Sequence, residues 1–168
     1  MADYTQLPIH ALRAYLWAEL KASGLYKEND YYVESLGATL VPIIPAQEIP
    51  EFNNLLPGKP FITYDYEVKP VLQNWWIQEE IAILNITSTD QDEINSVIML
   101  LQDLFRRYDL SAAEINGYNP SSLFHFHYTA IEAVFSPEPF KSEGGHMQGV
   151  VHILYKFTRS TSSENGRF

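Results

Sequence analysis

Two histidines in one predicted strand form the clearest chemical pattern in the sequence. His125 and His127 are separated by a single residue. On a strand, side chains two positions apart point to the same face, so both imidazoles could reach one metal ion. Glu132 follows five positions later, and His146 and His152 come further along. The pattern therefore raises a metal site as one hypothesis.

The run His-x-His-x4-Glu resembles the metal motif of the cupin family, but the rest of that motif is missing. The flanking glycines are absent, and the chain has too few strands for a jelly roll. On a continuous strand Glu132 also points to the face opposite the histidines. The alternative is that His125 and His127 pack on a half-buried face or at a subunit contact, and this interpretation is favoured.

Other catalytic patterns find no support in the sequence. Glu79 and Glu80 are adjacent, so on a strand they point to opposite faces and cannot share a reacting centre. No Gly-x-Ser-x-Gly elbow occurs. Gly144 and Gly145 are followed by His146 and lack the Lys-Ser/Thr ending of a phosphate loop. We therefore expect that the protein is not an enzyme and uses no cofactor.

The amino-acid composition excludes several classes of protein. The 168 residues include no cysteine, which excludes disulfides and thiol nucleophiles, and 11 basic against 21 acidic residues give a formal charge of −10. This charge argues against a nucleic-acid binder and against attachment to an anionic membrane. No membrane span or secretory signal is recognisable, so we expect a cytoplasmic site of synthesis. The 11 Tyr, 9 Phe and 3 Trp with only 19% charged residues suit a surface engaged in protein contacts or a β-rich core.

In the first third of the chain, the sequence predicts one helix followed by one long extended segment. Residues 5–23 have helical apolar spacing with Gly24 as a stop. Residues 25–60 contain repeated prolines and predict an extended arm over the body. An apolar run at Phe52, Leu55 and Leu56 makes this arm a candidate contact surface.

In the rest of the chain, the sequence predicts strands before and after a well-defined helix. The expected elements are strands at 61–68 and 75–87, a helix at 90–108 capped by Asp90 and Glu93, a short helix at 111–116, and strands at 123–135 and 149–159. Residues 136–148 would form a long β-hairpin loop, and residues 160–168 a disordered tail. Residues 1–159 would thus form a single α+β domain, an antiparallel-rich sheet with two helices packed on one face.

The order of these segments resembles a known family. Residues 60–66 read Pro-Phe-Ile-Thr-Tyr-Asp-Tyr, and residues 79–86 read Glu-Glu-Ile-Ala-Ile-Leu-Asn-Ile. A helix then opens at Asp90 and ends near Arg107, and a Gly-Gly loop leads into Gly-Val-Val-His-Ile at 149–153. Over about residues 8–158 the chain resembles the tail-terminator (tail-completion) proteins of long-tailed bacteriophages, and more loosely their other neck proteins.

The resemblance implies a structural virion protein in the tail or neck. Such proteins form a homohexameric ring that caps the tail tube, stops its polymerisation and joins the tail to the head or connector. The partners would be other subunits, the tail-tube protein and a neck protein, with DNA only passing through the channel. A charge of −10 on each subunit would keep DNA from sticking there. Head-completion or stopper rings, a small metal-dependent enzyme using His125 and His127, and an adaptor binding a peptide along a sheet edge are the alternatives.

Candidate contact residues follow from the ring, which requires two different complementary patches on each subunit. For partner contact we expect the hairpin-loop residues Glu138, Lys141, Glu143 and His146. For subunit contact we expect the arm residues Phe52, Asn53, Leu55 and Leu56. Charged pairs across the ring could come from Asp92, Asp103, Arg106 and Arg107, for which a solvated helix face is the alternative.

Overall fold

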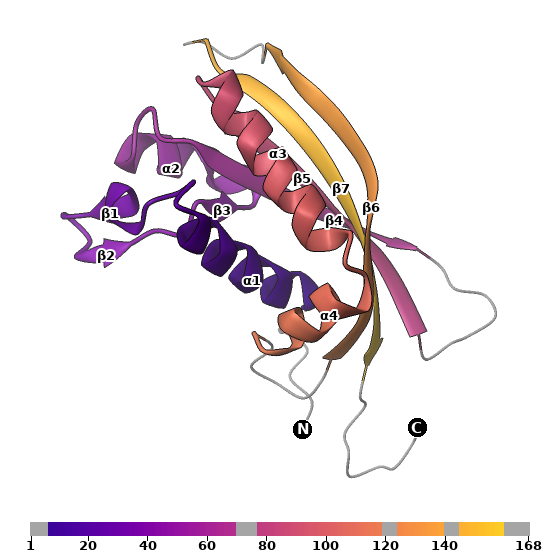
Figure 1. Ribbon diagram of the computed structural model, residues 1–168. Helices are drawn as coiled ribbons and strands as arrows, with labels where there is room; N and C mark the ends of the chain where they lie inside the picture. The colour runs from indigo at the N-terminus through magenta and orange to yellow at the C-terminus, as the bar shows by residue number, and fades with distance from the viewer. Residues whose placement is uncertain (1–6, 70–76, 119–123, 140–144, 160–168) are drawn as a thin grey trace.

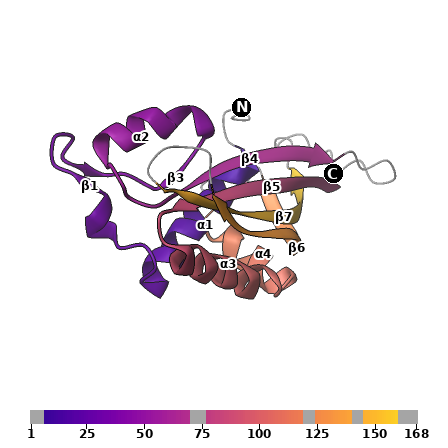
Figure 2. The ribbon, with the colours of Figure 1, turned by 90° about the horizontal axis from the view of Figure 1, so that it is seen from above.

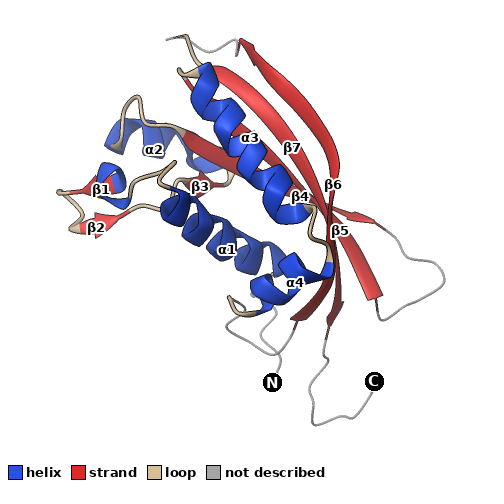
Figure 3. Ribbon diagram, in the orientation of Figure 1, coloured by secondary structure: helices blue, strands red, loops and turns tan. Residues whose placement is uncertain are grey.

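The computed structural model describes residues 7–69, 77–118, 124–139 and 145–159 (Figures 1 and 3). In chain order the α-helices are α1 Pro8–Ser23, α2 Ile49–Leu55, α3 Gln91–Phe105 and α4 Asp109–Asn116. The strands are β1 Tyr32–Val33, β2 Ala38–Thr39, β3 Ile43–Ile44, β4 Phe61–Lys69, β5 Ile77–Ser88, β6 Phe124–Pro139 and β7 Met147–Arg159. Two 3-10 helices, η1 Glu28–Tyr31 and η2 Ala46–Glu48, complete the set.

Five strands form the main sheet in the order β3-β4-β5-β7-β6, and β1 and β2 form a separate small ribbon. All neighbours in the main sheet are antiparallel except β3 and β4, which are parallel. The protein is therefore an α+β fold with an antiparallel-rich sheet, as the sequence predicts.

Most of the helical residues that the structure describes lie on one face of the main sheet. Helices α1, α3 and α4 lie on this face, while α2 lies beside the β3–β4 edge (Figures 1 and 2). Along β7, buried positions alternate with half-buried ones: Gly149, Val151, Ile153, Tyr155 and Phe157 are buried. This alternation is typical of a sheet with one face on the core. The short helix α4 joins α1 and α3, so three helices cover the face where two were predicted.

Local sequence determines where the two long helices begin and end. Gly24 ends α1 with φ 79°, a conformation that glycine adopts without steric cost. At α3, the Asp90 carboxylate accepts a hydrogen bond of 2.9 Å from the Asp92 N–H, which confirms Asp90 as the cap. The Asp90 N–H donates to the Ser88 hydroxyl over 3.1 Å and not to Glu93, so the Glu93 half of the predicted capping box does not form. Helix α3 ends at Phe105, earlier than predicted, because Tyr108 takes φ 52° and turns the chain into α4.

Gly149 allows α3 to lie directly on the sheet. A Cβ atom added at Gly149 would lie 2.8 Å from Cγ2 of Ile94 and 3.0 Å from Cδ1 of Ile98. Both isoleucines belong to the apolar stripe of α3 and are buried. The absence of a side chain at position 149 therefore sets the distance between helix and sheet.

Residues 25–60, predicted as an extended arm over the body, are not simply extended: they contain η1, β1, β2, β3, η2 and α2, and they pack onto the body. Strand β3 of this segment pairs with Ile62 and Thr63 at the start of β4. The buried Tyr31 hydroxyl donates a hydrogen bond of 2.7 Å to the Pro60 carbonyl, which ties the two ends of the segment together. The prolines that flank β3 are compatible with its place at the sheet edge.

The hairpin between β6 and β7 is longer, and its loop shorter, than predicted. Pairing continues to Pro139 and Met147, so residues 136–139 and 147–148 of the predicted loop belong to the two strands. The register shifts between Phe126 and Tyr128, Ile131 and Ala133, and Phe135 and Glu138. These bulges bend β6 and let the strand run past Pro137.

Candidate functional site

His125 and His127 lie side by side on the face of the sheet without helices. Both are exposed, and their ring centroids are 4.6 Å apart. His127 Nε2 lies 2.9 Å from the Thr158 hydroxyl on β7. Partial burial, and secondarily His125, lowers the pKa of His127. The predicted juxtaposition of the two imidazoles is thus present.

The other potential ligands of the metal hypothesis are engaged elsewhere. Glu132 lies on the same open face as the histidines and not on the opposite one, because bulges interrupt the alternation of β6, and it forms an ion pair of 3.8 Å with Lys69. The His152 ring contacts Phe135, with centroids 5.6 Å apart. Within residues 7–69, 77–118, 124–139 and 145–159, no three side chains of His, Asp or Glu come together as a metal centre would require. The described residues therefore offer a metal two imidazole nitrogens only.

Glu79 and Glu80 point to opposite faces, as predicted. Glu79 lies on the open face, 3.5 Å from the Lys156 ammonium. Glu80 is buried on the helix-covered face and accepts a hydrogen bond of 2.6 Å from the Tyr155 hydroxyl. Burial raises the pKa of Glu80, and the Tyr155 hydrogen bond opposes part of that rise. The pair cannot act on one reacting centre.

The charged residues predicted to pair across the ring separate into two groups. Asp92, Asp103 and Arg106 are exposed on α3 and are accessible to a partner. Arg107 is half-buried and already paired: its guanidinium forms a bidentate pair with the Glu114 carboxylate, with an Nη1–Oε1 distance of 2.9 Å. The prediction for Arg107 is therefore corrected to a contact within the chain.

Tyr15 completes this cluster and fastens α1 to the α3–α4 turn. Its hydroxyl donates to Glu114 Oε2 over 2.5 Å and accepts from Arg107 Nη2 over 2.9 Å. The hydrogen bonds from Arg107 lower the pKa of Glu114, while burial, followed by the Glu114 carboxylate, raises the pKa of Tyr15. The cluster is structural, because all three groups satisfy one another.

The four arm residues predicted to contact another subunit also fall into two groups, one buried and one accessible. Phe52 and Leu56 are buried in the chain's own core, and the Phe52 ring packs 5.3 Å from Phe61, centroid to centroid. Their prediction as interface residues is therefore wrong. Asn53 is exposed, and Leu55 is half-buried at the edge of a groove.

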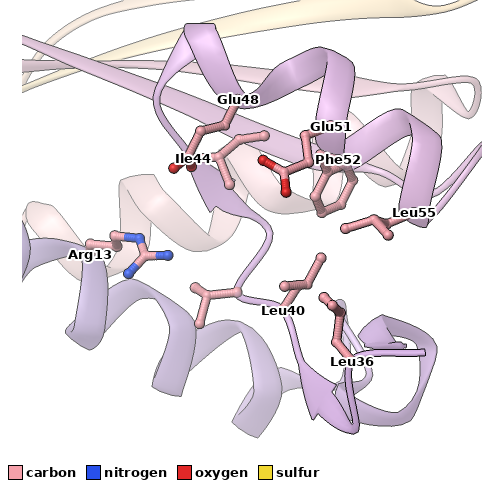
Figure 4. A pocket seen from close by; sticks show the side chains of 9 residues that line it. Arg13, Leu36, Leu40, Ile44, Glu48, Glu51, Phe52 and Leu55 are labelled. Carbon is pink, nitrogen blue, oxygen red and sulfur yellow. The ribbon is translucent and has the colours of Figure 1, made fainter. Parts of the chain in front are cut away.

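This groove lies between α1, the chain leading into β3, and α2 (Figure 4). Its volume is about 300 Å³, and its lining is apolar apart from Arg13, Glu48 and Glu51. The Arg13 Nε donates to the Ile43 carbonyl over 2.6 Å, which holds the guanidinium at one end of the groove. Sequence reasoning missed the groove because its walls come from α1 and from residues 36–55, which are separated in the chain, and because Arg13 is only one of several charged residues on α1.

A second exposed apolar surface lies on the distal part of β6. Val134 is 36% and Phe135 54% exposed. Consecutive strand residues point to opposite faces, so this end of the hairpin presents an apolar side chain on each. The nearby predicted contact residue Glu138 is exposed in β6, and His146 is half-buried just before β7. Lys141 and Glu143 lie outside the described residues.

A scan against protein-family models finds no match, and a search of curated proteins finds no significantly similar sequence. No helix among the described residues is long and apolar enough to cross a membrane.

Proposed function

We propose that this chain is a structural subunit of a long-tailed bacteriophage, of the tail-terminator type. It assembles into a ring, which we expect to be a hexamer, that caps the tail tube, stops its growth and joins it to the head or connector. A neighbouring neck ring, formed by head-completion or stopper proteins, is the closest alternative. The ring is located in the virion and is assembled in the host cytoplasm.

The observation that carries the proposal is the exposed distal hairpin. An apolar surface of this kind, on a protruding and regular element, marks a contact with another protein. Phe135 is an aromatic anchor of the type that dominates binding energy at interfaces. The exposed Glu138 follows it in the same strand, so the hairpin offers a charged side chain near an aromatic one, a combination that protein interfaces use.

A second observation supports a ring in particular. A closed ring uses heterologous contacts, in which two different patches of each subunit meet. The distal hairpin and the groove beside Arg13 are two unlike surfaces on different elements. One can therefore serve the joining partner and the other the neighbouring subunit.

Mass in solution and imaging test the proposal. Light scattering across a range of concentrations, and electron microscopy with and without tail-tube protein, should reveal a ring and its attachment to tube ends. Phe135→Ser should abolish the attachment. Tyr32→Ser, which removes an aromatic ring of similar exposure from β1, is the matched control and should not. A chain that stays monomeric at every concentration, and forms no ring beside tail-tube protein, would contradict the proposal.

Metal analysis tests the enzyme alternative separately. The close pair of His125 and His127 is the observation that favours it. Protein purified without chelators should carry no stoichiometric metal. Bound metal at one equivalent that is lost in His125→Ala would instead favour the metal-dependent enzyme.

A further inference from the structure

The groove beside Arg13 has the properties of a docking site without an occupant. Leu36 is 55% exposed at its edge, and Leu40 and Leu55 are half-buried along it. Glu48 and Glu51 are exposed, and within the described parts of the chain neither forms an ion pair. Figure 4 shows the Glu51 carboxylate directed into the hollow. An occupant must supply an apolar group together with a cation.

The size of the groove limits the occupant to a short piece of chain. A volume of about 300 Å³ is at the lower end of the range for ligand pockets, roughly 300 to 1,000 Å³. It suits one aromatic side chain and its neighbours. With Arg13 at one end and two carboxylates along α2, the groove also favours a segment that carries both signs of charge.

The segment that follows β7 contains this combination. Residues 160–168 read Ser-Thr-Ser-Ser-Glu-Asn-Gly-Arg-Phe. Phe168 is the one aromatic residue of this polar stretch, and Arg167 precedes it directly. Arg167 can pair with Glu48 and Glu51, and Glu164 has the sign that Arg13 requires. The side-chain chemistry of the segment therefore complements that of the groove.

The length of the segment decides whether it can enter the groove of its own chain or that of a neighbouring copy. Nine residues span at most about 30 Å, whereas a domain of this length is roughly 40 Å across. Strand β7 ends at Arg159, at the end of the sheet away from α2 and the groove (Figures 1 and 2). A segment of this length that leaves β7 is thus better placed for a neighbouring molecule than for its own groove.

We propose that residues 160–168 of one subunit dock in the groove of the next copy, with Phe168 on the apolar floor and Arg167 against Glu48 and Glu51. The contact is heterologous, because a tail meets a groove, and it can therefore repeat around a closed ring. This inference rests on the proposed ring and identifies the contact that joins neighbouring subunits.

Peptide binding tests the contact apart from assembly. The probe is a labelled peptide of residues 160–168 with both ends blocked, and the receptor is the full chain with Arg167→Ser and Phe168→Ser, so that its own tail cannot compete. Fluorescence anisotropy should show binding that weakens at least tenfold in a Phe168→Ala peptide. Adding Glu51→Lys to the receptor should weaken binding at least tenfold. Glu28→Lys, the same charge change at an exposed residue outside the groove, should change it less than twofold.

Charge reversal provides a second criterion. A peptide with Arg167→Glu should bind the Glu51→Lys receptor at least threefold more tightly than it binds the receptor with Glu51 intact. Equal binding of the original and Phe168→Ala peptides, or equal losses with Glu51→Lys and Glu28→Lys, would overturn the docking.

Assembly separates this inference from the ring itself. At a concentration where the unaltered chain forms a ring, Phe168→Ala should shift the measured mass towards the monomer. An unchanged ring would overturn the inference and leave the ring standing. A monomeric unaltered chain that excludes the peptide, while its Phe168→Ala variant accepts it, would place the tail in its own groove and overturn the contact between subunits. No peptide binding to any variant would overturn the docking altogether.

Discussion

The two faces of the main sheet are made by the same strands but held by different forces. On the helix-covered face, contacts are buried and exact in shape: Gly149 lies against Ile94, and the Glu80 carboxylate meets the Tyr155 hydroxyl. On the open face, contacts are partly exposed and ionic, as between Glu79 and Lys156. Buried contacts contribute most to stability, whereas exposed ion pairs contribute little. We therefore expect the first face to maintain the fold and the second to be available for assembly.

The largest expected effect is a difference in stability loss between a phenylalanine on the covered side and one that is exposed. Phe105 is fully buried in α3 against the Tyr15 ring, whereas Phe135 is exposed. Phe105→Ala should lower the free energy of unfolding by about 3 to 5 kcal/mol, because it leaves a cavity in the core. Phe135→Ala should change it by less than about 0.5 kcal/mol. Urea unfolding monitored by circular dichroism measures both, and similar losses would abolish the distinction between the faces.

A smaller effect is expected where the helix layer touches the sheet. Gly149→Ala places a methyl group within 2.8 Å of Ile94. We expect a loss of about 1 to 3 kcal/mol, typical of overpacking, measured by the same unfolding assay. Gln148→Ala, one residue away and facing the open side, is the control and should cost less than about 0.5 kcal/mol. A Gly149→Ala variant as stable as this control would mean that α3 can move away from the sheet without cost.

The buried carboxylate gives the covered face a pH dependence. Burial raises the folded-state pKa of Glu80 above its ordinary value. Its favourable contribution is therefore fully present below the unfolded-state pKa and is lost as pH rises through the folded-state pKa. In Glu80→Gln the side chain stays neutral, so the variant should gain about 1 kcal/mol relative to the unaltered protein between pH 4 and pH 7.

Unfolding curves at several pH values measure this gain. Glu79→Gln removes the same charge from the open face and serves as the control. A difference between Glu80→Gln and the unaltered protein that does not grow with pH would show that the Tyr155 hydrogen bond outweighs burial.

The smallest effect is expected for the ion pairs of the open face. Lys69 and Glu132 lie 3.8 Å apart with about two fifths of each side chain exposed, at 42% and 40%. A double-mutant cycle with Lys69→Met and Glu132→Gln should give a coupling energy below about 1 kcal/mol that falls with added salt. A larger, salt-independent coupling would mean that this pair acts as a structural clamp.

Features of the fold that depend on residues close together in the chain could be predicted from the sequence, and features that depend on distant residues could not. The end of α1 and the start of α3 follow from Gly24 and Asp90, which are signals next to the helix that each one bounds. The folding of residues 25–60 could not be predicted in the same way. Strand β3 consists of two residues. Its pairing with β4 is specified by tertiary packing and not by a local pattern in β3.

The candidate sites follow the same rule. The juxtaposition of His125 and His127 required only strand geometry, and the prediction for it is confirmed. The contact of Arg107 with Tyr15 could not be inferred, because the two residues are 92 positions apart in the chain. The groove beside Arg13 has no signature at all in one segment, since each of its walls is ordinary by itself.

The position of β7 has a consequence for synthesis of the protein. This strand comes last among those described, yet it lies between β5 and β6 and pairs with both along almost its whole length. While a ribosome is still translating the chain, β5 therefore has an unpaired edge and its apolar side chains lack cover. Such edges are prone to pair with other nascent chains. The sheet closes only when residues 147–159 emerge, and a chain interrupted before that point is an expected substrate for chaperones and proteases.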